Sequence, residues 1–313
     1  MIHERIHDET AREPGVTGRA VVRADAEYPA RLREVPTAPA TLHVRGGLAD
    51  ADALAVAIVG SRRATSYGLD VAELLAADLA ARGVTIVSGL ARGIDAAAHR
   101  GALRVGGRTI ALLGSGVDVI YPPENRELAA RIVERGALVS QFPAGTPPLP
   151  QNFPMRNAVI AAMSLAVVVV EAAERSGSLI TARVAAELGR EVLAVPGRIT
   201  APESRGANRL IQDGAALTMG WEDVVAALPE RWKVCLRDAP APAEPVLDRA
   251  DGREREHQSR VLGLLGEDPV DIDLVIERSG LGAGRVSAAL LDLELEGRVR
   301  QIEGKRFVRV GRG

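Results

Sequence analysis

Cysteine is almost absent from this chain of 313 residues, since Cys235 is the only one. A single thiol cannot form an internal disulfide or supply a four-cysteine metal site, and it fits a reducing compartment. The five histidines are not accompanied by further cysteines, so we expect no zinc site. The sequence predicts neither a bound metal nor another cofactor.

Lysine is nearly as rare, because all the other basic residues besides Lys233 and Lys305 are arginines. Neither lysine stands in the G-K-[ST] motif of a phosphate-binding loop, which excludes most ATPase families. The net charge of −2 argues against a globally basic nucleic-acid binder, although a local basic patch remains compatible with it. Aromatic residues make up only 3% of the chain, which argues against a long base-stacking platform.

Long apolar runs are also missing. The longest, LAVVVV at 165–170, is far shorter than the ~20 residues of a membrane span. The first fifteen residues carry acidic groups and have no apolar core, so they do not resemble a secretory signal. We therefore expect a cytoplasmic protein with no membrane partner. The hydrophobic content of 47% is that of a folded globular chain, and the length predicts about two domains.

From residue 54 onwards, short apolar runs alternate with amphipathic segments that end on glycine. This alternation predicts an α/β fold with a doubly wound, mostly parallel, extended Rossmann-like sheet and right-handed crossovers. The expected strands are 54–60, 84–89, 108–114, 137–140, 165–171 and 191–197. The expected helices are 69–83, 94–106, 124–136, 154–164, 178–189, 207–214 and 221–228.

The sequence divides into four segments. We expect a polar N-terminal arm over 1–24, the Rossmann-like domain over 25–233, a linker rich in proline and alanine over 234–252, and a small α+β domain over 253–313. Within 25–233, the stretch 25–47 has no regular pattern and is expected to be irregular.

The last segment predicts three helices followed by a hairpin that turns at Glu303–Gly304, which is the pattern of a winged helix. Residues 251–313 contain eleven basic and twelve acidic residues, and the acidic ones include Asp292, Glu294 and Glu296 on the expected recognition helix. These carboxylates would repel phosphates, whereas the hairpin end is locally basic. We expect this domain to bind a protein, or to touch DNA only with its hairpin.

Several predicted strands end in polar turns that contain glycine, and ligands of such sheets bind at this edge. Glycine lets backbone N–H groups approach a ligand closely, and helix N-termini attract anions. Arg62, Arg63 and Arg92 add full positive charges. We therefore expect an anion site that spans several turns, formed by Gly60, Ser61, Arg62, Arg63, Ser88, Gly89, Leu90, Ala91, Arg92, Gly93, Gly114, Ser115, Gly116, Ser176, Gly177 and Ser178.

Other residues allow two interpretations each. Asp95 and His99 are four apart and could form an acid–base pair, but a capping aspartate and a packed histidine are favoured. Glu171 could be a catalytic carboxylate, or it could position Arg156 through an ion pair. Phe153 could stack on a base or fill the core, and so could Phe142.

Six stretches together resemble the DNA-processing protein A family (DprA/Smf). They are VAIVGSRRATSYG (56–68), IVSGLARGIDAAAHRGAL (86–103), TIALLGSGVDVIYPPEN (109–125), FPMRN (153–157), SGSLITARVAAELGREVLAVPG (176–197) and GANRLIQDGA (206–215). The resemblance implies non-catalytic binding and protection of single-stranded DNA, loading of the recombinase RecA in natural transformation, and a homodimer. It also implies a C-terminal winged helix, for which a competence or single-strand-binding protein is a candidate partner.

The resemblance also implies roles for individual residues. Arg62 is the leading phosphate contact, and the same groove is lined by the Gly89–Gly93 turn, Ser115-Gly116 and further residues. These are Asn157 and the segment from Ser176 to Thr181. Apart from the resemblance, Arg156 could hold a phosphate and Phe153 could stack on a base, and we expect both, together with Asn125, among the contacts. Leu210, Ile211 and Leu217 occupy the positions of the dimer interface, where we expect them to pack across a two-fold axis.

The chain departs from the family pattern at three positions. Pro123 stands where many relatives have a lysine, Gln141 replaces a glutamate, and Ala158 replaces an arginine. Two basic contacts are thus missing, for which Arg63, Arg92 or Arg126 could substitute. Many relatives begin with a small helical domain that we do not expect here.

Other classes of function fit the sequence less well. Related folds hydrolyse the N-glycosidic bond of nucleoside monophosphates, but they carry P-G-G-x-G-T-x-x-E, and residues 176–181 have no counterpart of its glutamate. A dinucleotide enzyme is disfavoured because Gly114-Ser115-Gly116 lacks the third glycine of the fingerprint. A winged-helix regulator is disfavoured by the acidic recognition helix.

Overall fold

The computed structural model describes residues 11–12, 18–238, 257–266, 268–295, 297–302 and 304–309. The chain forms two units, Met1–Pro240 and Ala241–Gly313, which are described separately. The boundary between them falls within the segment expected to be a linker. No helix in the described ranges is long and apolar enough to cross a lipid bilayer.

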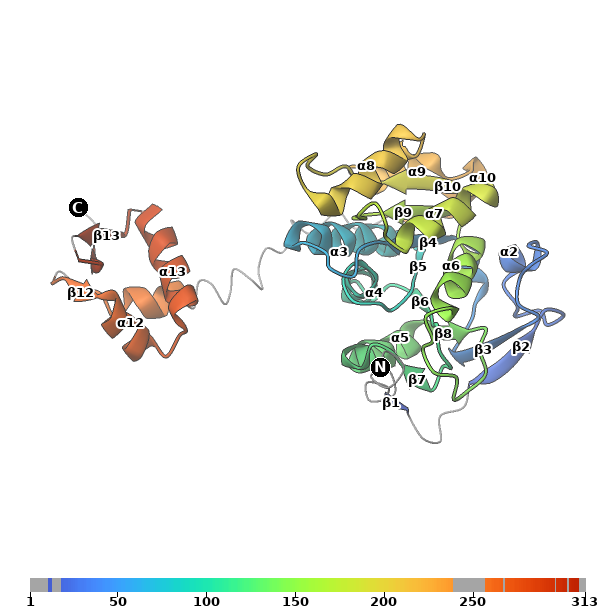
Figure 1. The fold of residues 1–313 in the computed structure, drawn as a ribbon, viewed down its shortest axis with the longest axis horizontal. Helices are drawn as coiled ribbons and strands as arrows, with labels where there is room; N and C mark the ends of the chain where they lie inside the picture. Colours follow the sequence, from blue (N-terminus) through green and yellow to red (C-terminus); the bar gives the residue numbers. More distant parts are fainter. Residues whose placement is uncertain are drawn as a thin grey trace. The chain divides into compact units, whose positions relative to one another are not determined.

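A nine-stranded sheet forms the centre of the first unit (Figure 1). Its order is β11-β10-β9-β4-β5-β6-β8-β3-β2, and the pairs from β11 to β8 are parallel. The strands are β2 (Arg19–Val22), β3 (Thr41–Gly46), β4 (Ala55–Val59), β5 (Thr85–Ser88), β6 (Thr109–Leu112), β8 (Ala137–Ser140), β9 (Ala166–Val169), β10 (Glu191–Ala194) and β11 (Ala216–Leu217). The predicted fold class is confirmed.

The chain order reverses between the neighbouring strands β4 and β9. From β4 the sheet grows through β5, β6 and β8 on one side, and from β9 it grows through β10 and β11 on the other. The connections after β4 and β9 therefore lead to opposite sides, which opens a crevice at the carboxyl ends of the strands. This is the edge where the polar glycine turns were expected.

Helices cover both faces of the sheet (Figure 1). They are α2 (Ala30–Arg33), α3 (Ser66–Ala81), α4 (Ile94–Arg104), α5 (Arg126–Arg135), α6 (Asn152–Met163), α7 (Ser178–Glu187), α8 (Arg205–Gln212), α9 (Trp221–Ala227) and α10 (Glu230–Lys233), with short 3-10 segments at Asp50–Ala53, Pro123–Asn125 and Pro202–Ser204. Alternate residues of β4 enter two different cores. Ala57 and Val59 pack with α6 and α7, whereas Val56 and Ile58 pack with α3, α4 and α9.

The first 47 residues differ from expectation. The segment 1–24 is not only an arm, because Arg19–Val22 form the edge strand β2 and Ala11–Arg12 form β1, which pairs with β7 (Val119–Ile120). The segment 25–47 is not irregular throughout, because Thr41–Gly46 form β3, antiparallel to β8. Within β2 only Val21 is buried, so the strand is too short and too exposed to show an alternating pattern.

The C-terminal unit has the predicted order of elements. Residues 257–262 are helical, and α12 (Ile272–Ser279) and α13 (Ala283–Leu295) follow. The strands β13 (Val299–Ile302) and β14 (Arg306–Arg309) form the hairpin, and β12 (Val270–Asp271) pairs with β14. Val275, Leu293 and Phe307 are buried together in its core. Glu303 and Glu296 lie outside the described residues, so their predicted places are not tested.

Candidate functional site

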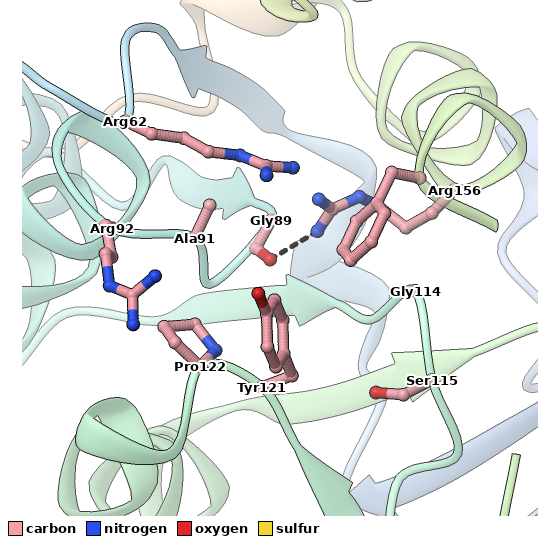
Figure 2. A pocket seen from close by; sticks show the side chains of 10 residues that line it. Arg62, Gly89, Ala91, Arg92, Gly114, Ser115, Tyr121, Pro122 and Arg156 are labelled. Atoms are coloured by element: carbon pink, nitrogen blue, oxygen red, sulfur yellow. Dashed lines mark hydrogen bonds between the residues drawn. The ribbon is translucent and has the colours of Figure 1, made fainter. Parts of the chain in front are cut away.

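A groove of about 800 Å³ lies at the carboxyl edge of the sheet. Its wall is formed by the turn after β4, the first turns of α6 and α7, and the loop before α6. A smaller pocket adjoins it, between the turns after β5 and β6 and the start of α6 (Figure 2). Arg62, Tyr121, Phe153 and Arg156 line both, so the pocket is a deeper part of the same groove.

Most of the predicted phosphate-binding residues meet in this groove and its pocket. Those that line it are Gly60, Ser61, Arg62, Arg63, Gly89, Ala91, Arg92, Gly114, Ser115, Phe153, Arg156, Asn157, Ser176, Gly177, Ser178 and Thr181. They come from five separate turns or helix starts, which the parallel arrangement of the strands brings to one edge.

Arg62 presents an exposed guanidinium group to the groove. Its Cζ lies 5.0 Å from the centroid of the Phe153 ring, and the Tyr121 and Phe153 rings are 6.0 Å apart and tilted by 51°. Among the described residues Arg62 forms no ion pair with a carboxylate. Its positive charge and a neighbouring aromatic surface are thus both available to a ligand.

Arg156 is the opposite case, because only 4% of it is exposed. Its Nη1 donates to the carbonyl oxygen of Gly89 (Figure 2). The same Nη1 donates to the carbonyl oxygen of Leu112 at 2.6 Å, and Nε donates to Asn157 Oδ1 at 3.0 Å. Burial lowers the pKa of Arg156 to about 10, so the side chain stays charged at neutral pH. Arg156 therefore ties the end of β5 to the end of β6.

Asp95 lies behind this arginine at the start of α4. Its carboxylate is buried and accepts a long hydrogen bond from the Ala91 amide at 3.4 Å. Burial raises the pKa of Asp95, and the positive charge of Arg156 opposes that rise. The aspartate thus offsets part of the buried charge of Arg156 without an ion-pair contact.

The hypothesis that Glu171 forms an ion pair with Arg156 is wrong. The Glu171 carboxylate accepts from the Thr65 amide at 2.9 Å and from Thr65 Oγ1 at 2.5 Å. Its backbone oxygen accepts from the Ser61 amide at 2.7 Å. A Cβ at Gly68 would lie 2.5 Å from this carboxylate, so a larger residue there would displace the carboxylate from Thr65. Glu171 fixes the turn that carries Arg62.

The acid–base pair of Asp95 and His99 is also wrong, and the packed-histidine alternative is confirmed. His99 is fully buried, and its Nδ1 lies 2.7 Å from Thr109 Oγ1. Burial lowers the pKa of His99 to about 3, so the ring is neutral at physiological pH. It does not line the groove.

Five predicted contacts are not part of the groove lining: Ser88, Leu90, Gly93, Gly116 and Asn125. Three of them shape the turn after β5. Leu90 is buried and has a positive φ of 59°, and Asn125 Nδ2 donates to the Leu90 carbonyl at 2.8 Å. Ser88 Oγ donates to the Ile58 carbonyl at 2.6 Å. A turn motif by itself does not separate residues that touch a ligand from residues that hold the turn.

Several lining residues were not predicted from the sequence. Tyr121 and Pro122 line the deeper pocket, and the groove is bordered by Pro148, Pro150, Pro154, Pro202 and Glu203. The proline-rich loop 143–150 was a usable signal, since a rigid loop before a helix often borders a site. Of the three suggested substitutes for missing cations, Arg63 and Arg92 line the groove or its pocket and Arg126 does not. Arg92 is paired with Glu124.

The positions expected at a dimer interface lie beside the edge strand β11. Leu210 and Ile211 are partly buried against the core of the first unit, and Leu217 on β11 is 44% exposed. No partner chain is present, so their packing across a two-fold axis stays a prediction.

Comparison with known proteins assigns this architecture. Residues 19–229 match the family model of DNA recombination-mediator protein A, and residues 238–305 match that of the DprA winged helix domain. Protein Smf of Escherichia coli is 43% identical over 93% of this chain and 78% of its own length. DNA processing protein DprA of Streptococcus pneumoniae is 44% identical over 64% of this chain and 70% of its own length.

Two solved structures share the fold. The crystal structure of DprA from Streptococcus pneumoniae aligns with a TM-score of 0.64 and 41% identity, covering 68% of this chain and 75% of that one. DNA processing protein A from Helicobacter pylori, which binds single-stranded DNA, aligns with a TM-score of 0.57 and 28% identity, covering 70% of this chain and 95% of that one. With both of its domains matched in the expected order, the chain belongs to the DNA recombination-mediator protein A (DprA/Smf) family.

Proposed function

We propose that the groove binds single-stranded DNA. The observation that supports this most is the exposed Arg62 guanidinium beside the Phe153 ring, in an open groove lined by several separate turns. A succession of anion-binding turns fits a chain of phosphates better than a single nucleotide. The Helicobacter pylori relative, which binds single-stranded DNA, supports the same function.

The chemistry of the groove fits phosphate and base together. Arg62, Arg63 and Arg175 supply positive charge for phosphates, and the N-terminus of α7 adds the partial positive charge of its helix dipole. An unpaired base has a free face that can stack on Phe153, whereas the bases of a duplex are already stacked on each other. The groove is thus expected to prefer single strands.

Protection of incoming single strands, RecA loading and homodimerisation are part of the same proposal. The family description of a recombination mediator supports transfer of the bound strand to a recombinase. We infer that the protein acts without catalysis, since none of the relatives named above has the name of an enzyme. The exposed edge strand β11, with Leu217, is the surface proposed for a second copy of the chain.

Fluorescence anisotropy of a labelled oligo-dT across a salt series tests the DNA-binding proposal, with unlabelled duplex as competitor. With ~3 to 4 phosphates neutralised, log K should fall with log[salt] at a slope of about −2 to −3. Arg62→Ala should weaken binding and make the slope shallower by about 0.7, the value for one phosphate of a single strand.

Arg131→Ala is the matched control, because Arg131 is an exposed arginine on α5 that does not line the groove. It should leave both affinity and slope unchanged. Equal effects of the two substitutions, or a preference for duplex DNA, would contradict the proposal.

A further inference from the structure

A second group of arginines lies at the amino ends of the strands, whereas the groove lies at their carboxyl ends. Arg31 is on α2, Arg190 directly precedes β10, and Arg231 is on α10 (Figure 1). Arg31 Nη2 donates to the Ala53 carbonyl at 3.3 Å. Ala53 precedes β4 whereas Gly60 follows it, so at ~3.3 Å per residue the group lies roughly 20 Å from the groove.

These three side chains are here called the arginine cluster, and two of them, Arg31 and Arg231, lie beside one indole ring. The Cζ of Arg31 is 5.5 Å from the centroid of Trp232, and that of Arg231 is 5.8 Å from it. Burial and the positive charge of Arg190 lower the pKa of Arg31 to about 10, with a smaller contribution from Arg231 and a partial opposition from Glu34. The positive charges of Arg190 and Arg231 therefore both repel that of Arg31.

The cluster contains buried donors that lack acceptors. Arg31 Nε, Arg190 Nε and Trp232 Nε1 are buried without a hydrogen-bond partner in the structure. Within the described ranges, none of the three arginines forms an ion pair. Buried donors are normally satisfied, and an exception indicates a specific cause such as a bound ion.

We propose that the arginine cluster binds a phosphate group, either free orthophosphate or the terminal phosphate of a nucleotide. A phosphate presents several oxygens to the planar forks of arginine, and its charge cancels the repulsion among the three cations. Arg231 is exposed, and Arg31 and Arg190 are partly exposed, so a ligand can reach the outer guanidinium nitrogens. The indole N–H is a further donor at the wall of the site.

Trp232 provides a direct signal. The chain has two tryptophans, so Trp221→Phe leaves Trp232 as the only one, next to two of the cluster's guanidinium groups. Its fluorescence is titrated with sodium phosphate, thymidine 5′-monophosphate or thymidine, at constant ionic strength set with sodium chloride. We expect a saturable change with both phosphates and none with thymidine. Saturation at a lower concentration of the monophosphate identifies a nucleotide, and equal or better binding of orthophosphate identifies the free ion.

Substitutions inside and outside the cluster show which arginines the phosphate response requires. Arg190→Gln should weaken the response at least tenfold, whereas Arg183→Gln, an exposed position on α7, should leave it unchanged. Arg62→Ala in the DNA groove should also leave it unchanged, which keeps the two sites distinguishable. In the absence of phosphate, Arg190→Gln should keep or raise Tm, because one of three like charges is removed.

Three results would overturn the proposal: phosphate acting no differently from chloride, an unchanged response in Arg190→Gln, or an equal response to thymidine. If Trp221→Phe does not fold, the wild-type Tm decides instead. Saturating phosphate should raise it by about 3 °C over chloride in the wild type and not in Arg190→Gln, and equal shifts in both would overturn the proposal.

Discussion

Arg156 allows a test of whether a groove arginine binds DNA or shapes the site. Its guanidinium group is buried and joins the carbonyls of Gly89 and Leu112, which end two neighbouring strands. Arg156→Lys keeps the positive charge, but its ammonium nitrogen ends one bond short of Nη1, which donates to both carbonyls, and nothing replaces the Nε donor to Asn157. We expect that ammonium group to reach one of the two carbonyls and to leave the other without a donor.

The size of the effect follows from these contacts. A hydrogen bond to a charged group contributes about 1.5–3 kcal/mol, and a buried carbonyl left unpaired adds to the loss. Arg156→Lys should therefore lower the free energy of unfolding by about 3 kcal/mol. For a domain of this size the corresponding decrease in Tm is about 9 °C.

The DNA-binding measurement distinguishes the two roles. A residue that only positions the turns should change oligo-dT affinity without changing the salt slope, because the number of neutralised phosphates stays the same. Arg62→Ala should show the converse, a shallower slope at nearly unchanged stability. Arg156→Ala, which removes the positive charge, is measured beside Arg156→Lys. A salt slope shallower by about 0.7 in Arg156→Ala, with no loss of stability, would refute the reasoning and make Arg156 a phosphate contact.

Two further predictions concern buried polar groups. In Glu171→Gln, one of the two hydrogen bonds between residue 171 and Thr65 is lost beside the turn that carries Arg62. This should lower the free energy of unfolding by about 2 kcal/mol in urea denaturation and should weaken oligo-dT binding. Unchanged stability would contradict this prediction. His99 has a folded-state pKa of about 3, so between pH 6.5 and 3 only the unfolded chain is protonated there, and stability should fall as pH decreases from 6.5, by up to about 3 kcal/mol at pH 4. His99→Gln should flatten this dependence in denaturation curves at pH 7, 5.5 and 4, and an unchanged slope in that variant would contradict the prediction.

The parallel part of the sheet was predictable because its strands are continuous apolar runs that glycine terminates. The expected strand 165–171 contains β9, and the expected helix 94–106 contains α4. The antiparallel edge was not predictable in the same way. β2 buries one residue of four, and β3 leaves its own alternate residues half-buried, so neither produces a strong periodic signal.

The groove was predictable as a location and less so as a set of contacts. Parallel strands necessarily bring their carboxyl ends to one edge, so a list of strand-end turns already identifies Arg62, Ser115 and Ser176 as neighbours of one site. Which side chain faces the solvent depends on the backbone dihedral angles of each turn. Turns have no hydrophobic periodicity from which these orientations could be predicted. Leu90 was therefore assigned as a contact although it is buried and does not line the groove.

In the groove, different residues hold the turns in place and contact the phosphates, although arginine could do both. Arg156 is buried and holds strand ends together, and Glu171 holds the turn after β4 through Thr65. Arg62 then remains exposed on a turn that is already fixed, so little conformational entropy is lost when it meets a phosphate. Substitutions of the buried groups should therefore act on DNA binding through stability and turn geometry, whereas substitutions of Arg62 should act through charge alone. The salt slope, measured beside the free energy of unfolding, assigns each groove residue to one of these two tasks.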